Sequence, residues 1–356
     1  MVIITSLAVM VAAIYILSII TDEFFIESLD EIANRWKLPS NVAGASLMAM
    51  GSSMPELSIS MLALLRVGDY SEVGAGTIVG SAVFNILVIT GASALVRPIH
   101  ITWRVVVRDI AFYTVSVLML LYFFADGHIT TIEALTLLSL YAIYIFVLFQ
   151  WRRLAPGLAG GHVDIIVPDS DELLEDDVPI TLYERMTAVI IRIFSLFTGD
   201  IRHHYIRTFI LSVVVIAGVS WLLVENAIAF AEAIGVPPLV IALTVLAGGS
   251  SVPDMIASVI VAKEGRGDMA IANAVGSNIF DITIGLGLPW MIMLLWRGSS
   301  IVVGTGNLWI STAILMGTVF ILFAMLIIRR GLGKLEGGIL VGLYIAYILW
   351  AWIAGS

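Results

Sequence analysis

The sequence predicts an all-α polytopic membrane protein: ten transmembrane helices arranged as two inverted five-helix repeats, with broken helices at the midplane. Three observations support this prediction. Hydrophobic residues make up 60% of the 356 positions and charged residues only 13%, which is more apolar surface than a soluble core of this length can bury. Apolar runs long enough to cross a bilayer recur along nearly the whole chain. One polar motif also occurs twice, once in each half.

Stretches of about 20 apolar residues predict the ten spans. We expect them near residues 2–24, 40–65, 72–96, 103–124, 130–151, 206–230, 238–262, 269–296, 305–328 and 337–354. The first span lacks a basic n-region and a clear cleavage site, so we interpret it as a retained helix and not as a signal peptide. With the N-terminus outside, the 18 lysine and arginine residues face inward except Arg66 and Arg297, as the positive-inside rule expects. We therefore expect an integral protein of the cell (plasma) membrane with N- and C-termini extracytoplasmic.

The duplication extends over more than one motif. GSSMPELSIS at 51–60 recurs as GSSVPDMIAS at 249–258, an offset of 198 residues. VGSAVFN at 79–85 recurs as VGSNIFD at 275–281, an offset of 196 residues, so Ser81 corresponds to Ser277 and Asn85 to Asp281. Because five helices separate each element from its copy, the second half crosses the membrane in the opposite sense. We divide the chain into a first repeat (1–151, motif region 40–95), a cytoplasmic linker (152–205) and a second repeat (206–356, motif region 237–290).

The linker contains an acidic run, DSDELLEDD at 169–177, followed by LYERMTAVIIRIFSLF at 182–197. The second segment has the spacing of an amphipathic helix lying on the inner membrane surface. Clustered carboxylates leave open a regulatory calcium site in the acidic run, although the run lacks the glycine turn and ligand spacing of an EF-hand loop. The chain has no cysteine, which excludes disulfides and thiolate metal sites.

Each copy of the first motif places one carboxylate, Glu56 or Asp254, inside an apolar stretch. A charge at mid-bilayer costs roughly 2.5 to 3.5 kcal/mol on insertion scales, which calls for a compensating partner such as a cation. The Ser-x-Pro-acid pattern fits a capping box at a helix start, and a helix start at this depth implies a broken helix that lines a cavity. We expect a break after Met50 or Gly248 that offers backbone oxygens of Ala49, Ser52, Ala247 and Ser250.

These oxygen donors suit hard cations. Calcium takes six to eight oxygens from carboxylates, carbonyls and waters, and two carboxylates neutralise its charge. Sodium ions could occupy overlapping positions built from the hydroxyls of Ser53, Ser81, Ser251 and Ser277 with the same two acids. Asn85 is expected either to join helices by a hydrogen bond or to line the site. Asp281, a third carboxylate in an apolar helix, is expected to bind a monovalent ion or carry a proton.

The two motif pairs, with GTIVGSAVFNI and GDMAIANAVGSNIFDITIGLGLPW, resemble the alpha repeats of the calcium/cation antiporter superfamily, in particular sodium/calcium exchangers. The resemblance implies exchange of calcium for sodium by alternating access, with Glu56 and Asp254 as central calcium ligands. It further implies that the carbonyls of Ser52 and Ser250 join the calcium site. It assigns the sodium and neighbouring positions to Ala49, Ser53, Ser81, Ala247, Ser251, Ser277, Asn85 and Asp281.

Asp254 and the stretch around GDMAIANAVGSNIFDI look more like the potassium-dependent branch, so potassium-dependent exchange and proton/calcium exchange remain alternatives. A cation channel is less favoured than a carrier, because inverted repeats are typical of secondary transporters. An aspartyl protease is disfavoured, because its G-x-G-D match at 265–268 falls in a predicted polar loop. We therefore expect a transporter and not an enzyme, with no cofactor. Its expected partners are calcium ions, sodium ions and the lipid bilayer, with no nucleic acid and no obligate protein partner.

Overall fold

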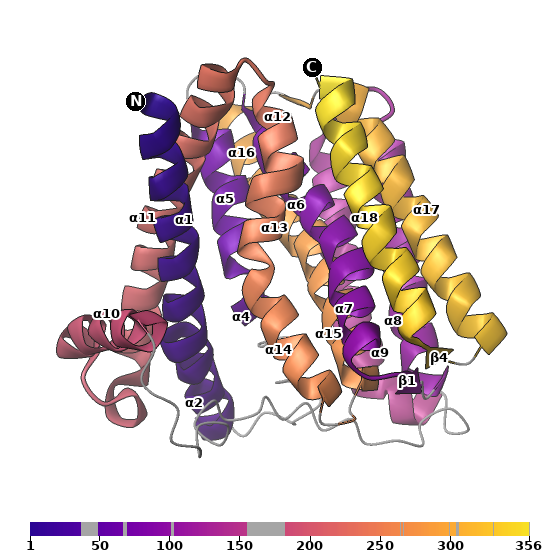
Figure 1. Ribbon diagram of the computed structural model, residues 1–356, viewed down its shortest axis with the longest axis horizontal. Coiled ribbons are helices and arrows are strands. Elements are labelled where there is room, and N and C mark those ends of the chain that lie inside the picture. Colours follow the sequence, from indigo (N-terminus) through magenta and orange to yellow (C-terminus); the bar gives the residue numbers. More distant parts are fainter. Residues whose placement is uncertain are drawn as a thin grey trace.

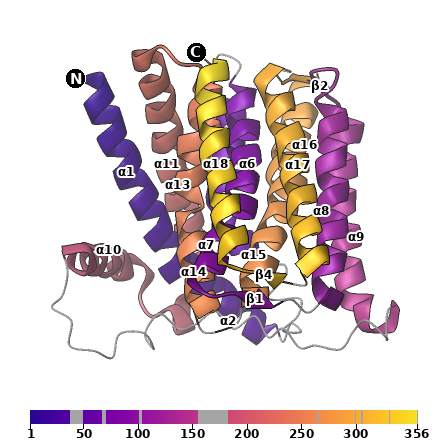
Figure 2. The same ribbon diagram turned by 45° about the vertical axis from the view of Figure 1, so that its right-hand side comes forward.

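The computed structural model describes residues 1–36, 49–66, 70–100, 103–154, 182–263, 265, 267–298, 300–303, 306–329 and 331–355. Over these ranges the chain forms long helices packed side by side (Figure 1). Both chain ends lie at the same end of this bundle in the two views (Figures 1 and 2). The acidic run at 169–177 and residues 40–48 of the first motif region lie outside the described residues.

The first half contains the following helices and π-helical turns (η): α1 Val2–Ile20, η1 Thr21–Ile26, α2 Glu27–Arg35, α4 Ala49–Ser52, α5 Met54–Leu65, α6 Ser71–Phe84, η3 Asn85–Ile89, α7 Thr90–Val96, α8 Trp103–Phe123 and α9 Thr131–Leu154. The rest of the chain adds α10 Leu182–Thr198, α11 Ile201–Ile234, α12 Pro238–Ile241, η5 Ala242–Leu246, α13 Ala247–Ser250, α14 Val252–Lys263, α15 Gly267–Phe280, η6 Asp281–Leu286, α16 Gly287–Arg297, α17 Gly306–Arg329 and α18 Lys334–Gly355.

Four two-residue strands form two short antiparallel sheets. Strand β1 (Ile99–His100) pairs with β4 (Gly331–Leu332), and β2 (His128–Ile129) pairs with β3 (Ile301–Val302). Each sheet joins a loop of the first half to a loop of the second half, so the halves are tied together by backbone hydrogen bonds as well as by helix packing.

Seven helices in the described ranges are long and apolar enough to cross a bilayer, and eight if α12–α13 and α14, bent by 44°, form one broken span. The predicted spans 40–65 and 103–124 are not among these eight. In the first, residues 40–48 are not described. Helix α8 occupies the second, and the side chains of its first residues, 103–106, lie outside the described parts. The molecule is therefore an all-helical membrane protein.

Helices α1 and α11 pack along one another at one side of the bundle (Figure 1). They share a hydrophobic cluster with η1, η5 and part of α5, in which Phe25 and Ile228 are fully enclosed. A larger cluster joins α6, α8, α15, α16, α17 and α18. The broken helices lie between the two clusters, because α5 and α13 contact α11 and α1 as well as α6.

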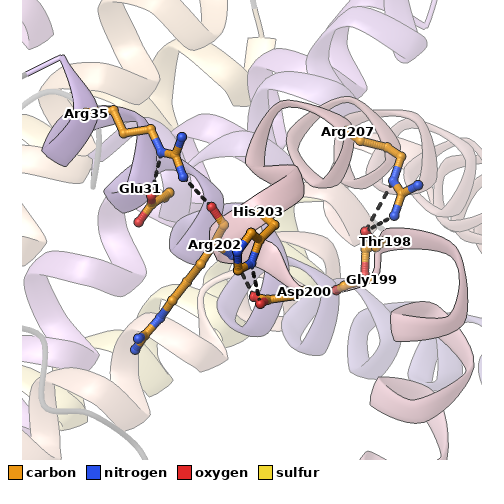
Figure 3. Close-up of polar contacts among 8 residues, drawn as sticks. All are labelled: Glu31, Arg35, Thr198, Gly199, Asp200, Arg202, His203 and Arg207. Carbon is orange, nitrogen blue, oxygen red and sulfur yellow. Dashed lines mark hydrogen bonds and ion pairs between the residues drawn. The ribbon is translucent and has the colours of Figure 1, made fainter.

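A group of polar contacts, called here the polar elbow, surrounds Gly199 and Asp200 between α10 and α11 (Figure 3). Asp200 caps α11 by accepting from the Arg202 N–H at 3.0 Å, and its other oxygen lies 2.6 Å from His203 Nδ1. Arg207 donates to the Thr198 carbonyl at 3.2 Å, and Arg35 at the end of α2 donates to the Arg202 carbonyl at 2.5 Å. The elbow fixes the start of α11 beside α2. Helix α10 lies crosswise to the long helices (Figure 2), with Met186, Val189, Ile193, Leu196 and Phe197 exposed.

Candidate ion-binding site

The two motif helices break at equivalent residues with nearly equal backbone angles. Ser53 has φ −93° and ψ 5°, and Ser251 has φ −94° and ψ 1°. In Figure 1, α5 rises from the break above α4, whereas α14 descends from the break below α13, so the two helices run in opposite directions. Helix continues through Ser52 and Ser250, so the predicted break after Met50 or Gly248 is wrong.

The position of the break follows from the proline two residues later. Proline fits the first turn of a helix and lacks an N–H, so the break falls just before Pro55 and Pro253. The carbonyls four residues earlier, on Gly51 and Gly249, consequently lack the amide donor that a continuous helix would supply. The sequence-based prediction placed the break at the glycines, two residues before Ser53 and Ser251.

Two further predictions concern hydrogen bonds at the breaks. The Ala247 carbonyl accepts from the Ser251 N–H and from the Ser250 hydroxyl, each at 3.3 Å, so it retains helical partners. Ser53 makes no side-chain capping bond to α5, so the predicted capping box is wrong for the first copy. Ala49 begins α4, and its side chain lies outside the described parts.

Three carboxylates lie at the breaks and the adjacent helices. The Glu56 side chain is 3% exposed and that of Asp281 1% exposed, whereas Asp254 is half-buried. Glu56 lies close enough to both Asp254 and Asp281 for their charges to interact. None of the ion pairs found in the described ranges includes any of the three. No basic side chain in the described ranges therefore pairs with the carboxylates of the site.

The predicted serines meet in pairs that cross between the halves. Ser81 on α6 lies 2.8 Å from Ser251 at the second break, measured between hydroxyl oxygens. Ser277 on α15 lies 3.4 Å from Ser52 at the first break. The hydroxyls of Ser250 and Ser251 lie near Glu56, and that of Ser52 lies near Asp254. Glu56 and Asp254 thus each lie near at least one hydroxyl from the opposite half.

Asn85 is held by a residue that sequence reasoning missed. Its amide donates to the Asn278 side-chain oxygen at 2.9 Å. The Asn278 amide in turn donates to the Ala82 carbonyl at 3.2 Å and to the Tyr113 hydroxyl at 3.0 Å. The interhelical hydrogen bond predicted for Asn85 is present, and its own oxygen remains without a partner in the described ranges.

Several buried oxygens at the site accept no hydrogen bond from the described residues. They are Ser53 Oγ, Glu56 Oε2, Asn85 Oδ1 and Asp281 Oδ1. An unsatisfied buried polar atom costs about 1 to 3 kcal/mol, so a set of them indicates a missing partner. No group of three His, Cys, Asp or Glu side chains in the described ranges is arranged to hold a metal by itself. Hydroxyl, amide and carbonyl oxygens must therefore complete any cation shell.

A fourth carboxylate, Asp22 in η1, also faces the second break, and sequence reasoning missed it. Asp22 and Asp254 line the same pocket, and their charges interact. Its sequence signal is an acidic residue inside the first apolar run. Asp22 has no acidic counterpart 198 residues later, so it lies outside the repeated motifs.

Comparisons with known proteins bear on the family and the fold of the chain. The family model described as "Sodium/calcium exchanger protein" matches residues 6–150 and 204–353. Sodium/potassium/calcium exchanger 1 of Gallus gallus is 27% identical over 94% of this chain and 76% of its own, and exchanger 5 of Homo sapiens is 32% identical over 78% and 68%. Two solved structures share the fold. The sodium-calcium exchanger NCX_Mj has a TM-score of 0.57 at 24% identity, covering 98% of this chain and 99% of its own, and the H+/Ca2+ exchanger CAX has 0.67 at 14%, covering 98% and 81%.

Proposed function

Because the chain belongs to the sodium/calcium exchanger family of cation antiporters, we propose that it exchanges calcium for sodium across the membrane by alternating access. The protein is a transporter and not an enzyme. The observation that carries the proposal is the enclosed set of anionic and hydroxyl oxygens at the two breaks, several of which lack a partner in the described ranges. Hard cations prefer such oxygen donors.

The carboxylate charges of the site determine which ions the protein is proposed to transport. Glu56 and Asp254 together neutralise one divalent ion, and their serine neighbours add neutral oxygens. Sodium needs the same donors but carries half the charge, so several sodium ions compete for the positions that one calcium ion occupies. Binding of one ion then excludes the other. This competition couples the two fluxes as long as the binding site changes sides only when it is suitably occupied.

In this proposal the twelve predicted residues have separate roles. Glu56 and Asp254 are the calcium ligands, with the carbonyls of Ser52 and Ser250. Asp281 and Asn85 serve a neighbouring monovalent position. The remaining contributors are Ala49, Ser53, Ser81, Ala247, Ser251 and Ser277. The hydrogen bonds between Ser81 and Ser251 and between Ser52 and Ser277 support these roles, because they bring predicted residues from both halves together.

We also propose the finer architecture that the sequence predicts. It consists of ten helices in two inverted five-helix repeats at 1–151 and 206–356, joined by a cytoplasmic linker at 152–205, with both termini outside a plasma membrane. Three observations support it. The two broken helices run in opposite directions, their break angles agree, and both termini lie at one end of the bundle.

Potassium-dependent exchange is a second candidate. The matched relatives from Gallus gallus and Homo sapiens are named sodium/potassium/calcium exchangers. The oxygens of Asp281 and Asn85 that have no hydrogen-bond partner among the described residues offer a place for a further monovalent cation beside the main site. Proton/calcium exchange would use the same Asp281 carboxylate as a proton carrier.

The test is calcium uptake by purified protein in sodium-loaded liposomes. We expect uptake driven by the sodium gradient, and its loss in Glu56→Gln and in Asp254→Asn while both variants remain monodisperse. Glu232→Gln, which alters an exposed carboxylate near Tyr70, is the matched control and should keep full uptake. Full exchange by either site variant refutes the ligand assignment. Omitting potassium or imposing a pH gradient separates the three ion couplings.

A further inference from the structure

A pocket leads to the half-buried carboxylate at the second break. One wall is formed by the end of α1 and the start of η1, and the other by the residues that flank the two breaks. Its polar lining comes from both walls, and its apolar lining from Ile14, Leu17 and the two motif prolines. The polar lining residues are Ser18, Thr21, Asp22, Ser52, Ser250 and Asp254.

Thr21 gives independent evidence that this pocket accommodates a ligand. Its side chain is 3% exposed, lines the pocket, and its hydroxyl oxygen has no hydrogen-bond partner in the described ranges. Threonine inside a helix ordinarily bonds to a carbonyl one turn earlier, as Thr77 does to Val73 at 2.8 Å. Thr21 stands where the helix changes to a π turn and does not make this bond.

Asp22 is a carboxyl group with no cationic partner among the described residues. Its carboxylate accepts from the Ser18 hydroxyl at 3.3 Å, and no ion pair in the described ranges includes it. The neighbouring charges that act on it are those of Glu23 and Asp254, both of which repel it. A bound cation would relieve this repulsion, and in an apolar span such relief is worth more than at a water-exposed surface.

The three carboxylates form a series of increasing burial. Asp22 is exposed, Asp254 is half-buried and Glu56 is 3% exposed, and charge interactions link each to the next. A cation that enters the pocket therefore meets Asp22 first.

From this arrangement we infer that Asp22, with the hydroxyl of Thr21, forms an access site that binds the transported cation before it reaches Asp254. The inference rests on the proposed function for the identity of the ion. The chemical class is set by the pocket itself: carboxylate and hydroxyl oxygens suit a hard calcium or sodium ion. Because the site adds charge along the approach, it concentrates the cation and raises its apparent affinity without joining the central shell.

The absence of cysteine provides a direct binding test. Ser18→Cys places a single thiol on the pocket wall and leaves Asp22 in place. In detergent, we expect millimolar calcium to slow modification of this thiol by a charged, water-soluble reagent at least about fivefold, and sodium to do so at higher concentration. Thr5→Cys, on the same helix but outside the pocket, should react at the same rate with and without calcium.

If the access site exists, the protection of the thiol by calcium depends on Asp22. In the double variant Ser18→Cys with Asp22→Asn, calcium should slow modification less than about twofold. Equal protection with and without Asp22, or no protection in Ser18→Cys itself, overturns the access site.

Transport kinetics separate this inference from the proposed function. Asp22→Asn should raise the calcium concentration for half-maximal uptake about three- to tenfold while the maximal rate changes less than about twofold. Glu232→Gln, at an exposed carboxylate outside the pocket lining, is the control and should leave both values unchanged. An unchanged half-maximal concentration in Asp22→Asn refutes the access site alone. Full exchange by Glu56→Gln refutes the proposed function, whatever Asp22 does.

Discussion

The two broken helices have the same backbone geometry but different surroundings. Glu56 at the first break is enclosed, whereas Asp254 at the second break opens into a pocket. Helix α1 contacts the second break, and Asp22 lines the pocket there. At the first break, η1 contacts α4 and α11 contacts α5, and α11 carries the fully buried Ser220 at the position that corresponds to Asp22. The difference is therefore encoded in the covering helices and not in the duplicated motif. A carrier needs this inequality, because both sides of its site must not be open at once.

The largest expected effect concerns the contact that brings the halves together. A Cβ atom at Gly80 would lie 2.7 Å from the Ala247 Cβ and closer still to the Leu243 carbonyl oxygen, so Gly80→Ala must push α6 away from the second half. We expect a loss of about 1 to 3 kcal/mol in unfolding free energy, as for other overpacked cores. Chemical denaturation in detergent measures it. Gly218→Ala, where no described heavy atom lies within 4 Å, is the control and should not destabilise.

Next in size is the effect of changing the length of each carboxylate. Glu56→Asp withdraws an enclosed oxygen from its proposed ligand position, so calcium affinity should fall about tenfold, or 1.4 kcal/mol. Asp254→Glu adds a methylene beside an open pocket, so the fall should stay below about threefold. Concentration-dependent uptake in liposomes compares the two variants. Equal losses would contradict the difference in enclosure between the two breaks.

A smaller effect is expected for the hydroxyl pair between the halves. Ser81→Ala and Ser251→Ala each remove one partner of a buried hydrogen bond, and the coupling energy in a double-mutant cycle should be about 0.5 to 1.5 kcal/mol. The cycle is measured by denaturation with and without calcium. Ser81→Ala combined with Ser277→Ala serves as control and should be additive, because no hydrogen bond joins these two described side chains. A coupling near zero for the first pair would show that the serines do not meet.

The smallest expected effect concerns the N-terminal ends of α1 and α11. Helix α11 starts at the Asp200 cap, whereas α1 has no side-chain cap. Hydrogen bonds from His203 and the Arg202 N–H hold the pKa of Asp200 below its usual range. A depressed carboxyl pKa stabilises the fold above the unfolded-state value and loses this contribution as pH falls below about 4.

Asp200→Asn keeps an acceptor at the cap but removes the charge, so the melting-temperature difference from the parent should be small at pH 5 to 7 and vanish on acidification below about pH 4. Asp126→Asn, at an exposed loop carboxylate, is the matched control. A melting-temperature difference that grows as the pH falls would contradict the expected direction of this effect.

The parts of the site that could be predicted are those that the chain repeats. Ser81, Ser251, Ser52 and Ser277 meet across the halves because duplication places equivalent residues at equivalent depths. The two missed residues lack such copies. Asp22 corresponds to Ser220, and Asn278 corresponds to Ala82, whose carbonyl it contacts. Residues that differ between the two halves cannot be predicted from internal sequence similarity.

Helix limits were harder to predict, because hydrophobicity reports on lipid contact and not on hydrogen bonding. The first helical stretch continues through η1 and α2 to Arg35, beyond the predicted end near 24, and α11 extends to 34 residues. In both cases polar residues extend a helix past its apolar core. The break positions required the backbone chemistry of proline, which a count of apolar residues does not include.

The serine pair that joins the halves also affects how the protein is made. Ser81 and Ser251 are 170 residues apart in sequence, so a ribosome that has delivered Glu56 to the membrane has yet to synthesise the hydroxyls that surround it. During that interval the first half carries an acidic side chain without its companions. We expect this half, expressed alone, to be recognised as unfinished and degraded, and co-expression with the second half to protect it.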